Sequence, residues 1–148
     1  MPQLVMFSKL FQGMSLEETA RSVGYLGLSG VDLTVRPGGH VLPDEVDPGL
    51  KDAIATLGQH GLSVPMITTG ITDPDDPTTE PIMQAAGDCG VRYIKLGYWQ
   101  YEGFGRIREQ IDHTRKLLDG IEATARRTGV RATIHIHSGE CLSASAPV

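Results

Sequence analysis

Short apolar runs recur along this chain, and most of them begin directly after a glycine. Four such runs open with glycine followed by valine or leucine, at Gly30, Gly61, Gly90 and Gly129, and a fifth begins near Leu4. Stretches with a helical spacing of apolar residues separate them, so one strand and one helix together occupy roughly 30 to 40 residues. This is the period of a strand–helix–strand unit, and it predicts a parallel sheet or barrel.

The apolar periodicity, together with the turn signals between the runs, predicts five strands and four helices. The expected strands cover residues 4–8, 31–36, 62–69, 91–96 and 132–137, and the expected helices cover 15–26, 47–60, 79–88 and 106–128. Ser15 and Glu18 have the spacing of a capping box at the start of the first helix. Asp47 followed by Pro48 is expected to cap the second helix.

These elements predict one domain over residues 1–148, of the α/β class and the (β/α)8 TIM-barrel type. We expect a partial barrel of about five parallel strands and four helices, with the C-terminal strands missing and with residues 143–148 as a tail or the start of a further helix. The loops after the strands are longer and carry more functional side chains than the short glycine turns before the strands. In a parallel barrel these loops gather at the C-terminal face, where active sites are built, and this favours an enzyme.

Charge and composition argue against several classes of protein. The net charge is −5, with 21% charged and 40% hydrophobic residues, which is typical of a soluble globular domain. An acidic chain is a poor partner for nucleic acid, and the basic cluster of Arg126, Arg127 and Arg131 fits a solvated helix end. Cys89 and Cys141 predict no disulfide framework. We find neither a signal-peptide pattern nor a membrane-spanning apolar stretch, so we expect a cytoplasmic protein with no membrane partner.

Two histidines stand out in the last expected strand. His135 and His137 are two residues apart, so on a strand both imidazoles point to the same side, and in a barrel this side is the interior. Neutral imidazoles there suit metal ligation, hydrogen bonds to a substrate or proton transfer. Glu140 follows the pair and is a candidate ligand for the same metal. The alternative is a polar barrel interior in which the histidines are satisfied by hydrogen bonds.

Three more residues are expected near the same end of the barrel. Arg36 shares the inner face of the second strand with Asp32 and Thr34, and Lys95 has the corresponding place on the fourth. Lys95 can hold a phosphate or carboxylate, or it can form a structural ion pair with Asp32. His40 follows two glycines that let a ligand approach the backbone, although a surface turn explains it too.

An aromatic loop follows the fourth expected strand. Trp99 and its aromatic neighbours in residues 98–104 can form an apolar wall for stacking on a sugar, or they can serve only to pack the loop against the next helix. The sequence contains no phosphate-binding GxxxxGK[ST] motif, no GxGxxG motif after a strand and no GxSxG nucleophile motif. These absences disfavour nucleotide binding and serine hydrolysis.

Three segments together resemble the sugar phosphate isomerases/epimerases that have a xylose-isomerase-like barrel. Residues 30–41 (GVDLTVRPGGHV) resemble the second strand and its loop, and residues 93–97 (YIKLG) and 135–139 (HIHSG) resemble the ends of the fourth and fifth strands. The similarity spans nearly the whole chain. It implies a (β/α)8 barrel that uses a divalent metal (Mn, Mg, Zn or Co) to isomerise or epimerise a sugar or sugar phosphate.

The resemblance also implies roles for individual residues. In that family Glu, Asp, His and Glu from successive strands typically hold the metal, and His135 stands where the first of these is found. His137 matches a histidine beside the substrate, and His40 matches a loop histidine near it. The candidate site residues are therefore His135 and His137 for catalysis, His135 and Glu140 for the metal, and His40, Lys95, Arg36 and Trp99 for the substrate.

For the full-length enzyme we expect the metal to polarise the substrate while a carboxylate removes the proton next to the sugar carbonyl, and reprotonation of the enediolate yields the isomer. We expect the 148-residue chain alone to have little or no isomerase activity, because most ligands belong to later strands. Two alternatives stay open. One is a zinc-dependent endonuclease relative, which the acidic charge disfavours. The other is a non-catalytic sugar- or metal-binding partial barrel, which can form a homo-oligomer through its unpaired sheet edge.

Overall fold

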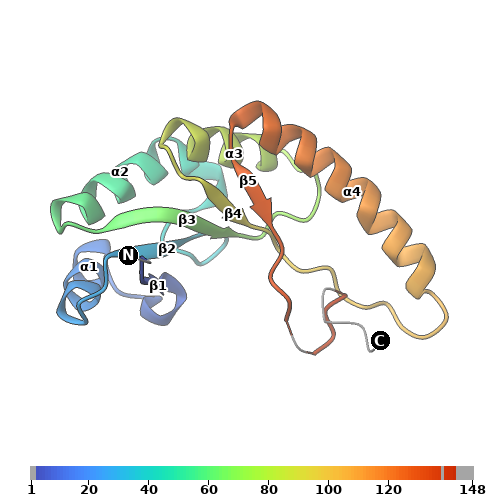
Figure 1. The fold of residues 1–148 in the computed structure, drawn as a ribbon, viewed down its shortest axis with the longest axis horizontal. Helices are drawn as coiled ribbons and strands as arrows, with labels where there is room; N and C mark the ends of the chain where they lie inside the picture. The colour runs from blue at the N-terminus through green and yellow to red at the C-terminus, as the bar shows by residue number, and fades with distance from the viewer. Residues whose placement is uncertain (1–2, 138, 143–148) are drawn as a thin grey trace.

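Five parallel strands form one sheet in which spatial order follows chain order (Figure 1). The computed structural model describes residues 3–137 and 139–142, so the expectation for residues 143–148 lies outside the described part. The strands are β1 (Val5–Phe7), β2 (Gly30–Val35), β3 (Ser63–Thr69), β4 (Tyr93–Lys95) and β5 (Arg131–Thr133). Each strand pairs in parallel with the next, and this confirms the predicted strand order of a partial barrel.

A helix follows each of the first four strands. They are α1 (Leu16–Tyr25), α2 (Val46–Gln59), α3 (Thr79–Asp88) and α4 (Ile107–Thr128), with short 3-10 helices η1 (Ser8–Phe11) and η2 (Pro43–Glu45). In Figure 1, α2, α3 and α4 lie along one side of the curved sheet. Leu33, Ile67 and Ile94 are fully buried and form one core with side chains of these helices. The alternating strand pattern therefore places its apolar residues on the helical side.

The predicted capping box is present at the start of α1. The Ser15 hydroxyl accepts a hydrogen bond from the Glu18 backbone N–H (3.2 Å), and the Glu18 carboxylate accepts one from the Ser15 N–H (2.8 Å). These two bonds satisfy donors that the first helical turn leaves without helical partners.

Replacing Ser15 with alanine is therefore expected to lower the free energy of unfolding by about 1 kcal/mol. Urea unfolding followed by circular dichroism measures this loss. Ser15→Asp is the matched control, because aspartate keeps an oxygen acceptor at the cap and should retain most of the stability. Equal losses in the two variants would show that the cap contributes nothing.

The fifth strand is shorter than predicted, and so is the fourth. The sequence predicts a strand over residues 132–137. In the structure β5 ends at Thr133, the last residue that pairs with β4. The Leu96 N–H still donates to the Thr133 carbonyl (2.9 Å), but the Gly97 N–H donates to the Ile71 carbonyl instead (2.8 Å). A strand continues only where a neighbour completes its ladder, so residues 134–137 lie outside the sheet.

One smaller expectation is also wrong, and one at the second helix is confirmed. Ile134 and Ile136, expected to be covered by helices, are 46% and 64% exposed because the strand has already ended. The bounds of α2 begin at Val46, but Asp47 has an extended backbone (φ −112°, ψ 113°), which the following proline favours and which separates the first residue from the regular helix. The regular helix therefore starts at Pro48, and Asp47 has the extended conformation of an N-cap residue, as the sequence predicts. Among the described residues, none of the helices is long and apolar enough to cross a membrane.

Candidate functional site

The inner face of the sheet carries a row of polar side chains. Strand register places Thr34 of β2 beside Thr68 of β3, Thr68 beside Lys95 of β4, and Lys95 beside Thr133 of β5. Because side chains alternate along a strand, Asp32 lies on the same face, one step below this row. The alternation along the sequence predicts Asp32, Thr34 and Lys95 on the inner face, and the strand register confirms it.

Asp32 is held by a neighbouring strand. The Thr68 hydroxyl lies within hydrogen-bond distance of both Asp32 carboxylate oxygens, at 2.9 and 3.0 Å. Burial raises the pKa of Asp32 to about 6, although the Thr68 hydrogen bond and the positive charges of Lys95 and Arg36 act in the opposite direction. The carboxyl group therefore changes its charge close to neutral pH. The sequence predicts Asp32 only as a possible partner for Lys95; its contact with Thr68 joins residues 36 positions apart and has no local signal in the sequence.

Lys95 is almost buried, with 9% of its surface exposed. Its Nζ atom lies 4.3 Å from the centroid of the Tyr98 ring, a cation–π arrangement. Within the described part of the chain, no ion pair within 4 Å joins Lys95 to Asp32, so the two interact only at longer range. The expected alternative of a direct structural ion pair is therefore not found.

Tyr98 also contacts the two histidines that follow β5. Its hydroxyl lies 3.3 Å from Nδ1 of His135, and its ring meets His137 edge-on with 5.0 Å between the centroids. The two histidine rings are 6.1 Å apart. Both histidines are exposed and stand outside the strand that was expected to carry them. The structure still brings them together, on the loop side of Lys95, through Tyr98.

His40 lies at the β2 end of the polar row. Its Nδ1 atom is 3.2 Å from the Thr34 hydroxyl, and its Nε2 atom is 3.4 Å from the Thr19 hydroxyl of α1. Partial burial lowers the pKa of His40, opposed by a hydrogen bond with the Phe11 backbone, so the ring is neutral at pH 7. The side chain borders a hollow of about 730 Å³ formed by the loops after β1 and β2. His40 is thus anchored by two threonines at the rim of a hollow.

Trp99 and Glu140 lie beyond this row. The Trp99 indole N–H donates to the Thr72 carbonyl (3.2 Å), and its ring borders an apolar hollow of about 240 Å³ together with Leu118 of α4. Glu140 has an exposed side chain, and its backbone carbonyl accepts a hydrogen bond from the Tyr101 N–H (2.6 Å). Trp99 therefore packs its loop against α4, which was the alternative to stacking on a sugar. Its role in binding a substrate stays a prediction.

The described residues do not form a metal site. Nowhere in residues 3–137 and 139–142 do three or more His, Cys, Asp or Glu side chains come together as a metal would require. His135 and His137 lie edge-on to each other beside Tyr98, but among the described residues no third such ligand joins them there. The assignment of His135 and Glu140 as metal ligands stays a prediction.

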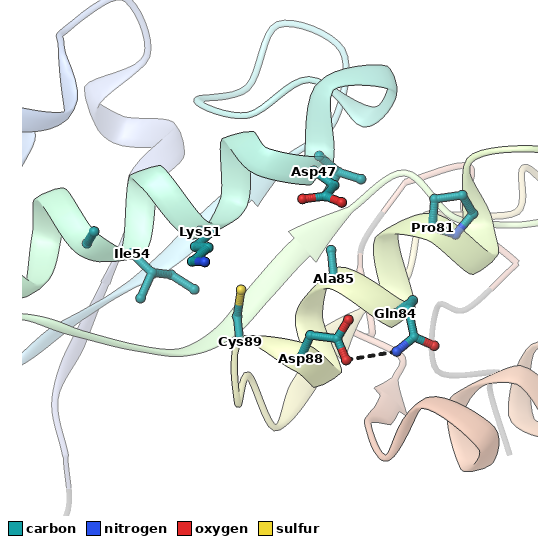
Figure 2. Close-up of a pocket in the computed structure, with 10 residues that line it drawn as sticks. Asp47, Lys51, Ile54, Pro81, Gln84, Ala85, Asp88 and Cys89 are labelled. Atoms are coloured by element: carbon teal, nitrogen blue, oxygen red, sulfur yellow. Dashed lines mark hydrogen bonds between the residues drawn. The ribbon is translucent and has the colours of Figure 1, made fainter.

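A separate groove of about 620 Å³ lies on the helical side of the sheet, between α2 and α3 (Figure 2). The labelled residues that line it are Asp47, Lys51, Ile54, Pro81, Gln84, Ala85, Asp88 and Cys89. Burial raises the pKa of the Cys89 thiol, and the nearby Asp88 carboxylate adds to the rise, so the thiol is protonated and unreactive at neutral pH. None of the candidate site residues lies in this groove.

No protein-family model matches the sequence, and no curated protein matches it. Solved structures do match the fold. A xylose isomerase-like TIM barrel protein from Mycobacterium smegmatis, in complex with magnesium, is 15% identical with a TM-score of 0.63 and covers 93% of this chain. Mannonate dehydratase from Streptococcus suis is 12% identical with a TM-score of 0.61 and covers 96%. A sugar phosphate isomerase/epimerase from Parabacteroides distasonis is 12% identical with a TM-score of 0.60 and covers 92%.

The chain spans about half the length of these structures: 55%, 54% and 51% of the three chains, respectively. At this low identity the likeness establishes the fold, which is that of a partial xylose isomerase-like TIM barrel. In such barrels the loops after the strands build the active site, and the polar row, Tyr98 and both histidines lie at that end of the sheet.

Proposed function

We propose that this chain belongs to a sugar-processing barrel and that its inner face around Lys95 binds an anionic sugar. The placement of Lys95 carries this proposal. It is a nearly buried cation in a row of hydroxyl side chains, within a chain of net charge −5. Burying an ammonium group costs free energy unless a partner compensates it, and an anionic ligand would do so. A sugar phosphate and mannonate, the compounds in the names of two structural neighbours, are both anions.

The surrounding residues supply the other contacts that a sugar needs. Arg36 follows β2 directly, its positive charge acts on Asp32, and it would add a second positive charge for a phosphate or carboxylate. The Tyr98 hydroxyl and the two imidazoles are hydrogen-bonding groups for sugar hydroxyls. Asp32 can hold or release a proton near neutral pH, which is the property required of a general acid or base.

The reaction we propose is isomerisation or epimerisation of the bound sugar. A base takes the proton from the carbon next to the carbonyl, the carbonyl oxygen gains a proton, and the resulting enediol is reprotonated to give the isomer. In this scheme His40, His135 and His137 orient the sugar oxygens. A divalent metal would polarise the carbonyl. The described residues bring no three such ligands together, so by themselves they do not form a site for that metal.

Replacing Lys95 with methionine is expected to weaken binding of fructose 6-phosphate at least about tenfold, because the positive charge is lost while the side-chain volume is kept. Isothermal titration calorimetry on the purified chain measures this. Lys116→Met, on the exposed surface of α4, is the matched control and should bind like the unaltered chain. Uncharged fructose should bind more weakly than the phosphate. Equal affinities for the two sugars, or an unchanged affinity in Lys95→Met, would refute the proposal.

A second candidate function is sugar binding without turnover. The absence of a three-ligand group among the described residues favours it for the chain as it stands. The exposed Ile134 and Ile136 beside β5 would suit association with a second copy. NMR of fructose 6-phosphate incubated with the chain and added Mg²⁺ or Mn²⁺ distinguishes the two functions, because only an isomerase produces new sugar signals.

A further inference from the structure

The ammonium group of Lys95 is covered by an aromatic ring. Its Nζ atom lies 4.3 Å from the Tyr98 ring centroid, and the side chain is 9% exposed. The neighbouring hydroxyls donate to other groups: that of Thr68 donates to Asp32, and that of Thr133 donates to the Ile94 carbonyl (3.1 Å). The Tyr98 ring is therefore the contact that the structure describes for the ammonium group of Lys95. An anion bound at Lys95 would need the space that this ring occupies.

The Tyr98 ring is also contacted by residues of a different segment. The Tyr98 hydroxyl lies 3.3 Å from Nδ1 of His135, and the ring packs edge-on against His137. Both histidines follow β5, whereas Tyr98 follows β4, so the contact joins two loops at the same end of the sheet. All three residues lie outside regular strands and helices. The two loops are joined next to them by an isolated bridge between Gln100 and Cys141, so the ring would leave Lys95 by rotation of its side chain.

We propose that Tyr98 is a gate over Lys95: its ring must leave before an anionic ligand reaches the ammonium group, and the contact with His135 holds it closed. This gate rests on the proposed binding of an anionic sugar at Lys95. The cation–π contact keeps the buried charge partly compensated while the site is empty. An anion makes a stronger, charge-assisted contact and displaces the ring. Tyr98 thus selects anions over neutral sugars, because the contact of a neutral sugar with Lys95 is too weak to displace the ring.

The gate is tested by the chemical accessibility of the Lys95 amine, with no ligand present. Reductive methylation of the whole chain, mapped by mass spectrometry, gives a separate rate for each lysine. Lys9, Lys51 and Lys116 are exposed and serve as internal standards. We expect Lys95 to react at least about tenfold more slowly than these in the unaltered chain, and Tyr98→Ala to remove most of the difference. Tyr98→Phe keeps the ring without its hydroxyl, so its Lys95 rate should be intermediate.

Tyr101→Ala is the matched control, because Tyr101 lies in the same loop and its side chain is exposed. It should leave the Lys95 rate unchanged. If Lys95 reacts as fast as Lys116 in the unaltered chain, or stays slow in a folded Tyr98→Ala variant, the gate is wrong.

Repeating the labelling with inorganic phosphate and then with fructose 6-phosphate separates the gate from the proposed function. Protection of Lys95, at lower concentration in Tyr98→Ala than in the unaltered chain, supports both. Faster labelling in Tyr98→Ala without protection by either anion supports coverage by the ring but overturns the anion site. An unchanged labelling rate with protection overturns the gate and leaves the anion site standing.

Discussion

Replacing Gly87 with alanine is expected to destabilise the chain by about 3 kcal/mol, a large part of the stability of a small domain. Gly87 lies in α3 where that helix crosses the end of α4. An added Cβ would overlap the Thr128 carbonyl oxygen and lie 3.2 Å from its carbonyl carbon. Thr128 cannot easily move aside, because it is buried and its hydroxyl donates to the Thr124 carbonyl (3.0 Å). The two helices would have to separate and open the core between them.

Urea unfolding of Gly87→Ala measures this effect. Gly58→Ala is the matched control, because Gly58 is also helical but its Cβ would meet nothing within 4 Å. In open space the higher helix propensity of alanine should stabilise the chain by up to about 1 kcal/mol. The two substitutions should therefore have opposite signs. A Gly87→Ala variant as stable as the unaltered chain would mean that α3 and α4 do not approach as closely as the structure indicates.

Replacing Asp32 with asparagine is expected to stabilise the chain above pH 6 and to have little effect near pH 4. Burial raises the pKa of Asp32 from its ordinary value of 3.8 to about 6. Between these values the folded chain keeps a proton that the unfolded chain has lost, so stability falls as the pH rises through this window. This pKa shift corresponds to a loss of at most about 3 kcal/mol in the free energy of unfolding, and partial exposure of the carboxyl reduces the loss to about 1–2 kcal/mol.

Unfolding by urea at pH 4 and at pH 8 tests this prediction. Asp76→Asn is a control of opposite sign, because hydrogen bonds from the hydroxyl and the N–H of Thr78 lower the pKa of Asp76. Its carboxylate contributes stability at neutral pH that is lost on acidification. A gain in Asp32→Asn of equal size at both pH values would show that the side chain acts through packing and not through its charge.

Much of the fold was predictable from residue spacing. The capping box at Ser15 and the bounds of α3 agree with the sequence, and α4 begins one residue later than expected. The glycine at the end of the last helix, Gly129, has the left-handed backbone (φ 74°) that ends helices. These features depend on a few consecutive residues, so a local pattern is sufficient to predict them.

The candidate site was less predictable. Alternation along β2 correctly indicated that Asp32 shares the inner face, but the bond from Thr68 depends on the register between β2 and β3. His135 and His137 were expected on a strand, and the strand ends before them because β4 turns away at Gly97. Their contacts with Tyr98 therefore come from the meeting of two loops. No periodicity in the sequence encodes such a meeting.

By itself the sequence determined the strand–helix period, the parallel barrel class and the set of polar residues on the inner face, because these follow from spacing along the chain. Only the tertiary structure decided that Tyr98 covers Lys95, that Thr68 holds Asp32 and that β5 ends at Thr133. Each of these features depends on the residue at which a neighbouring strand ends and on the path of the loop that follows it. Thr68 and Asp32 are 36 positions apart, and Tyr98 and His135, whose contact helps to place the Tyr98 ring, are 37 positions apart. The chain acquires such contacts only when the sheet has formed.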